Sequence, residues 1–273
     1  MTFHNAETSI ANGKPVRLYE FKRGVMRWLY NSSDRDILFN NGIYKTLVGG
    51  IIDEGVKRTG DVTADRMHIT APADLDFAQL YRAVPPADEI ELIIYDYHSN
   101  TTGAVIAWCG FVEMVGWPSL EKCKISAQTL LATLDVPGLR LTWERNCGAA
   151  LYDHRCKVNR DAHRVEVTVL SLDGSSVQSG ALQAYGDNWF TGGFVEWPVS
   201  GGNYELRAIV SHLATNLVLM GGTAGIKNGQ TLRVYPGCSR TIHVCHAKFG
   251  NKDNFRADPN LMGRNIFDGN PVF

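Results

Sequence analysis

The chain consists largely of short runs in which apolar and polar residues alternate, separated by tight turns. Residues 16–21 and 26–30 alternate on either side of a turn at Gly24, and residues 89–98 and 104–115 do so around Gly103. Such pairs predict antiparallel hairpins. Only residues 74–82 carry a helical stripe, and no helix–strand alternation or internal repeat occurs. The predicted fold class is therefore mainly β.

Two pairs of cysteines interrupt this pattern. Cys147 and Cys156 have eight residues between them, Cys238 and Cys245 have six, and 81 residues separate the two pairs. The second pair lies in a stretch with His243 and His246. Zinc ribbons and fingers usually place two to four residues within a pair, because both sulfurs must reach one small ion. The spacing here is wider than that.

An iron–sulfur cluster is larger than a single zinc ion and binds one thiolate at each of its four corners. It therefore tolerates more residues between the two cysteines of a pair. The residues alone leave an iron–sulfur cluster, zinc and two disulfides open, with the histidines as substitute ligands. Cys109 and Cys123 each stand alone in a strand-like run, and we interpret them as core thiols outside the constellation.

Composition and net charge limit the partners that the chain can bind and the compartment in which it is made. The formal net charge of the 273 residues is -1, so the whole chain has no electrostatic attraction to nucleic acid, and we expect no specific nucleic-acid partner. No run is long enough to span a membrane, and residues 1–7 do not resemble a signal peptide. We therefore expect synthesis in the cytoplasm, where thiols favour metal ligation over disulfides.

The residues from Pro236 to Phe255 resemble a known family. Pro236-Gly237-Cys238, then Cys245, Phe249-Gly250-Asn251 and Asn254-Phe255, are similar to the C-terminal signature of tail tip, or baseplate hub, proteins of long-tailed bacteriophages and gene transfer agents. That family is related to the tip attachment protein L of phage lambda. Residues 34–44 and the first cysteine pair fall where the family has corresponding segments. Ser239-Arg240 and Asn228-Gly229-Gln230 depart from its usual residues, but neither is a ligand.

The resemblance implies a structural protein with no enzymatic activity. It implies a homotrimeric ring in the virion tail tip, with the distal tail protein above and a central tip or fibre protein below, assembled in the host bacterial cytoplasm. It also implies a four-iron, four-sulfur (4Fe-4S) cluster, with zinc as the alternative. The metal ligands would be Cys147, Cys156, Cys238 and Cys245.

The predicted organisation has three parts. Residues 1–145 would form an N-terminal β-rich hub domain of barrel or sandwich type. Residues 146–250 would form a second β-rich domain closed by the four-cysteine iron–sulfur site, and residues 251–273 a C-terminal arm that is polar and rich in turn residues.

Two other functions compete with the structural one. A carbohydrate-binding β-module would use an exposed aromatic platform made of Trp189, Phe190, Phe194 and Trp197. A cysteine hydrolase would pair Cys245 with His246, or draw on Asp153 and His154, but neighbouring residues on a strand point to opposite faces.

Overall fold

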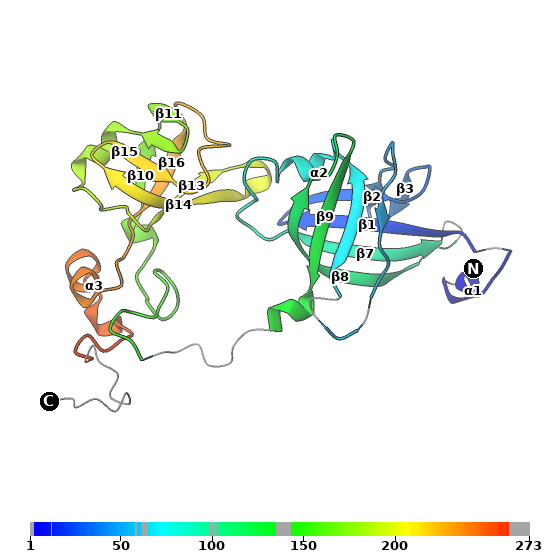
Figure 1. The fold of residues 1–273 in the computed structure, drawn as a ribbon, viewed down its shortest axis with the longest axis horizontal. Helices are drawn as coiled ribbons and strands as arrows, with labels where there is room; N and C mark the ends of the chain where they lie inside the picture. Colours follow the sequence, from blue (N-terminus) through cyan, green and yellow to red (C-terminus); the bar gives the residue numbers. More distant parts are fainter. Residues whose placement is uncertain are drawn as a thin grey trace. The chain divides into compact units, whose positions relative to one another are not determined.

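The computed structural model describes residues 3–11, 13–57, 59–61, 65–98, 101, 103–134 and 143–261. The chain forms two compact units, drawn in Figure 1. The first unit is Met1–Val136 with Pro198–Glu205, and the second is Pro137–Trp197 with Leu206–Phe273. Both are built on antiparallel sheets, which confirms the mainly β class. No helix among the described residues has the length and apolar character needed to cross a membrane.

The first unit contains a seven-stranded antiparallel sheet that curls into a half-barrel (Figure 1). In sheet order its strands are β2 (Met26–Asn31), β1 (Pro15–Arg23), β7 (Glu91–His98), β8 (Ala104–Gly116), β9 (Lys122–Thr129), β6 (Met67–Pro72) and β5 (Ile52–Asp53). The predicted hairpins β1–β2 and β7–β8 are confirmed. A Cβ at Gly110 would lie 2.0 Å from the Gln128 carbonyl oxygen, so glycine is required where β8 and β9 approach.

Shorter elements complete the first unit. A small hairpin, β3 (Ile37–Phe39) with β4 (Gly42–Tyr44), turns at Asn40 and Asn41, whose φ values of 46° and 58° suit a type I′ turn. Helix α1 spans Phe3–Glu7. Helix α2 spans only Asp76–Gln79, and its Phe77 ring stacks on Phe21 in the core with 4.2 Å between ring centroids.

The helix predicted over residues 74–82 is therefore shorter than expected. The N–H groups of Leu80, Tyr81 and Arg82 each bond to the carbonyl three residues earlier, so the chain continues as tight turns. Pro85-Pro86 follow closely and leave no room for a further α-turn.

A group of polar side chains ties the edge strand β5 to β1. Asp53 is buried, and its carboxylate accepts hydrogen bonds from Arg17 and from the Tyr19 hydroxyl, the latter at 2.6 Å. Arg17 also pairs with Asp96 at 3.1 Å. Burial opposes ionisation of Asp53, but the hydrogen bonds from Tyr19 and Arg17 outweigh it and hold the pKa of the carboxyl below its ordinary value.

Replacing Asp53 by alanine is expected to destabilise the protein by about 2 kcal/mol at pH 7, because the buried Tyr19 hydroxyl and the Arg17 guanidinium lose their acceptor. A carboxyl with a lowered folded-state pKa stabilises the fold above its unfolded pKa of about 4 and loses that contribution as pH falls through the folded value. The difference in free energy of unfolding between wild type and Asp53→Ala should therefore become smaller in acid. Urea unfolding at pH 7 and in acid, followed by tryptophan fluorescence, measures this difference.

The matched control is Glu54→Ala, which removes the neighbouring, exposed carboxylate that pairs with Lys124 on the surface. A surface ion pair of this kind contributes little, so the urea midpoint should hardly move. Equal effects of Asp53→Ala and Glu54→Ala would show that the Asp53 contacts do not close the half-barrel.

One segment from late in the sequence belongs to the first unit. Pro198–Glu205 lies there, and Glu205 pairs at 2.8 Å with Arg23, whose side chain is only 3% exposed. The Asn203 side chain also donates to the Arg23 carbonyl at 3.4 Å. The first unit is thus completed by a residue, Asn203, that lies 180 positions after its partner Arg23.

The second unit carries the other seven-stranded antiparallel sheet. Its order is β10 (Val165–Thr168), β16 (Thr231–Tyr235), β13 (Phe194–Pro198), β14 (Tyr204–Leu213), β15 (Asn216–Leu219), β12 (Ser176–Gln178) and β11 (Ser171–Asp173). Two segments without strands flank this sheet in sequence: residues 143–163 before β10, and residues 236–261 after β16, which include helix α3 (Ile242–Phe249). We call these two segments together the cysteine lobe.

Candidate cysteine site

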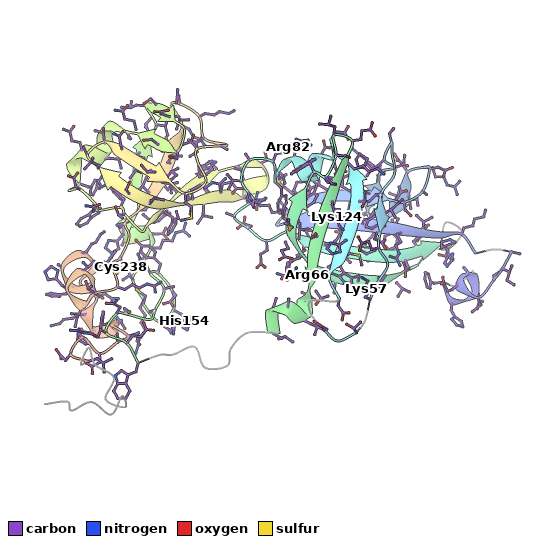
Figure 2. The ribbon with its side chains drawn as sticks, viewed as in Figure 1. Lys57, Arg66, Arg82, Lys124, His154 and Cys238 are labelled. Atoms are coloured by element: carbon purple, nitrogen blue, oxygen red, sulfur yellow. The ribbon has the colours of Figure 1, made fainter. Side chains whose placement is uncertain are left out.

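All four predicted ligands lie in the cysteine lobe and line one cavity. Cys147 and Cys156 come from the segment before β10, Cys238 from the loop after β16, and Cys245 from α3. The cavity has a volume of about 140 Å³. Figure 2 labels Cys238 where the chain enters α3, and His154 in the facing segment. The structure therefore brings together two pairs that are far apart in sequence.

The first pair is held in a turn organised by Asp153. The Asp153 carboxylate accepts N–H groups from Ala150, Arg155 and Cys156, at 3.2, 2.9 and 2.6 Å. The Cys156 N–H is the main reason that the pKa of Asp153 lies below its ordinary value. One side chain therefore satisfies three backbone donors of this turn.

The second pair is held by helix α3. The Thr241 hydroxyl caps it by accepting the Val244 N–H at 3.4 Å, and Gly250 ends it with a left-handed φ of 60°. Cys238 precedes the helix and Cys245 lies inside it, 7% exposed. The sequence analysis missed this helix, although a threonine cap and a glycine nine residues later are signals that could have found it.

The hydrolase hypothesis is wrong for Cys245. Its thiol is buried and donates to the Asn251 carbonyl at 3.2 Å, whereas His246 is exposed on the next helical position. Burial, followed by the proximity of the other three cysteines, raises the pKa of Cys245. A nucleophilic cysteine needs a lowered pKa and an adjacent base, which is the opposite arrangement.

Hydrogen-bond donors face the remaining three sulfurs. The Arg240 N–H lies 3.4 Å from Cys238 Sγ, and the Arg256 N–H lies 3.4 Å from Cys147 Sγ. The Asn251 side-chain amide lies 3.9 Å from Cys156 Sγ. Donors of this kind stabilise a thiolate, which is the form that binds metals.

The four thiols of the site are free and unpaired with one another. All six cysteines of the chain are free. Within the described part of the chain, no three or more His, Cys, Asp or Glu side chains are grouped so that they could hold one metal ion. A tetrahedral zinc needs four sulfurs about 2.3 Å from a common centre. The four thiols surround a shared space.

The Cys238 loop is also supported by residues 189–191 and by helix α3. A Cβ at Gly237 would lie 2.0 Å from the Thr191 carbonyl oxygen, so only glycine permits this close backbone contact. Lys248 donates to the Gly237 carbonyl at 2.7 Å and to the Trp189 carbonyl, and its Nζ lies 4.6 Å from the Trp189 ring centroid. Burial lowers the pKa of Lys248 to about 8.

The four aromatic residues considered as a sugar platform do not form one. Phe190 and Trp197 are 0% and 1% exposed and belong to the interior. Phe194 is half-buried and stacks on Tyr235 at 4.6 Å between centroids. Because a stacking platform needs its rings exposed together, the carbohydrate-binding hypothesis is wrong for this set.

The two other cysteines lie in the first unit. Cys123 in β9 is 0% exposed, which confirms its interpretation as a core thiol. Cys109 in β8 is only half-buried, so the same interpretation is wrong for it: its strand places it at the margin of the core. Neither lines the cavity of the cysteine lobe.

Three of the basic side chains on the first unit have an ion-pair or ring partner. Arg66 pairs with Glu113 at 3.4 Å and Lys124 with Glu54 at 2.9 Å, and Figure 2 labels both cations. Arg82, also labelled, stacks over the indole of Trp117. Such cations are partly neutralised or already in contact with a ring, which weakens a phosphate-binding surface.

Comparisons with known proteins agree with this architecture. Residues 20–159 match the family described as "Baseplate hub protein, N-terminal attachment domain", and residues 188–265 match "Phage conserved hypothetical protein BR0599". A chain from the virion of a native gene transfer agent particle has a TM-score of 0.77 at 17% identity, covering 99% of this chain and 96% of that one. At that identity the likeness shows the fold alone.

A relative is known from Xylella fastidiosa (strain 9a5c). It is an uncharacterized protein that is 25% identical over 189 residues, covering 63% of this chain. The match spans only 38% of that relative's own length.

Proposed function

We propose, on the ground that this chain belongs to the phage baseplate hub protein family, that it is a structural component of the virion tail tip. It would form a homotrimeric ring between the distal tail protein above and the central tip or fibre protein below, after assembly in the host bacterial cytoplasm. Ring subunits meet through head-to-tail surfaces that close on rotation. The family description of residues 20–159 as an attachment domain supports this role for the first unit.

The proposal includes a 4Fe-4S cluster held by Cys147, Cys156, Cys238 and Cys245. The observation that supports it most is that these four thiols line one cavity. The donor set is soft and uniform, as iron–sulfur clusters require, and N–H groups face three of the sulfurs.

The chain's own residues explain why a cross-link is needed there. Among the described residues, the apolar cluster of the lobe has three buried members, Ala149, Cys156 and Val158, with four partly buried side chains packed against them. So few side chains offset only part of the entropy lost on ordering two segments without strands. When bound, the cluster would supply four iron–thiolate bonds between these segments. We assign it this cross-linking role.

Elemental analysis tests the cofactor. Protein purified without oxygen is expected to be brown and to contain iron and acid-labile sulfide in equal amounts, about four of each per chain, with little zinc. The measurement is colorimetric iron and sulfide analysis alongside zinc determination on the same sample. A colourless, zinc-loaded and fully folded protein would contradict the assignment.

A further inference from the structure

We propose that Asn251 is a positioning residue that ties the two cysteine pairs together before any metal binds. Its backbone contacts Cys245 and its side chain contacts Cys156, which is 95 positions away in sequence. The inference deepens the proposed function and rests on it where the cluster is concerned. The contacts of Asn251 with Cys245 and Cys156 are made by the protein chain alone and need no metal.

The end of helix α3 places Asn251 at this point. Gly250, in the left-handed conformation, lets its N–H reach the His246 carbonyl at 2.9 Å. The Asn251 N–H then reaches the Cys245 carbonyl at 3.0 Å. This pair of bonds is the glycine-terminated helix end that folds the next residue back beneath the helix. Asn251 is thus held against the turn that carries Cys245.

The side chain of Asn251 spans the gap to the other pair. Its Nδ2 donates to the Cys156 carbonyl at 2.5 Å and lies 3.9 Å from Cys156 Sγ. Its Oδ1 accepts a hydrogen bond from Asn254 Nδ2 at 2.7 Å. Because Oδ1 is occupied by a donor, the amide is oriented with its own donor toward Cys156. One residue therefore fixes the distance between one cysteine of each pair.

This position requires an amide. Aspartate has nearly the same shape, but its carboxylate cannot donate and would face the Cys156 carbonyl and sulfur with a negative charge. Alanine removes the contact altogether. Partners behind metal ligands orient those ligands, and their loss typically lowers metal affinity about 10-fold to 100-fold.

The test uses the full chain with Asn251→Ala and Asn251→Asp. The control is Asn260→Ala, an exposed asparagine on the same segment. In protein purified without oxygen, iron release to bathophenanthroline is expected to be about 10-fold to 100-fold faster for both Asn251 variants and unchanged for the control. In metal-free protein, hydrogen exchange of residues 147–156 should be about tenfold faster in the Asn251 variants only.

The two readouts separate this inference from the cluster assignment. If wild type contains no iron or sulfide but the Asn251 variants still show faster hydrogen exchange of residues 147–156, the role of Asn251 is supported and the cluster proposal is contradicted. If Asn251→Asp, which preserves the side-chain shape, exchanges and releases iron like wild type, the inference is overturned. It is also overturned if Asn260→Ala changes both rates as much as the Asn251 variants do.

Discussion

Replacing any one of the four proposed ligands by serine is expected to leave the purified protein colourless, with less than about a tenth of the wild-type iron content. The four variants are Cys147→Ser, Cys156→Ser, Cys238→Ser and Cys245→Ser. A hydroxyl is a hard, weakly acidic ligand where the site offers soft thiolates. Because the lobe has so small an apolar cluster, loss of metal is expected to make it open more often and be cleaved faster by protease. Iron and sulfide analysis, visible absorbance and limited proteolysis of each variant measure both effects.

The remaining two cysteines provide matched controls. Cys109→Ser and Cys123→Ser alter the first unit and should keep the full iron content. The Cys123 thiol donates to the Pro72 carbonyl at 3.2 Å, a bond that a serine hydroxyl can also make. If Cys109→Ser lost the colour while Cys238→Ser kept it, the assigned set of four ligands would be wrong.

Deleting residues 262–273 is expected to give a cluster-bearing protein that is monomeric and fails to enter tails. This segment is the part of the predicted arm, residues 251–273, that lies outside the described residues. An arm that becomes ordered on a neighbouring subunit or on the tail ring contributes to assembly and not to the fold of its own chain. Light scattering of the free protein and complementation of tail assembly measure the two properties.

A second truncation, after Asn254, is expected to behave differently. The Arg256 N–H faces Cys147 Sγ, and the Arg256 carbonyl accepts the Gly148 N–H at 3.3 Å. Arg256 therefore belongs to the cysteine site, and a truncation that removes it should release the cluster. Equal iron content in the two truncations would contradict this assignment.

The particle itself tests the assembly proposal. Three copies per particle are expected, with the distal tail protein as one neighbour and the central tip or fibre protein as the other. Quantitative mass spectrometry of purified particles, together with cryo-electron microscopy of the tail tip, gives the copy number and the neighbours. Six copies, or infectious particles completed by the chain without residues 262–273, would overturn the proposal.

Local sequence was sufficient for the strands and for the choice of thiols. Alternation has a period of two residues, so the hairpins β1–β2 and β7–β8 could be predicted from a few consecutive positions. The cysteines needed only their chemistry and spacing to be selected as a set. The threonine cap and glycine stop of α3 were also local signals, although their meaning became plain only in the structure.

Only the tertiary structure decided which distant residues meet. Asp53 with Tyr19, and Arg23 with Glu205, are contacts between segments that no short pattern connects. The same holds for Phe190 and Trp197, whose burial depends on how the strands of the second unit pack. The sequence by itself determined the strands, their turns and the four thiols. The fold decided that Asn251 and Cys156 would be neighbours, because contact across 95 positions depends on the whole path of the chain and leaves no periodic trace.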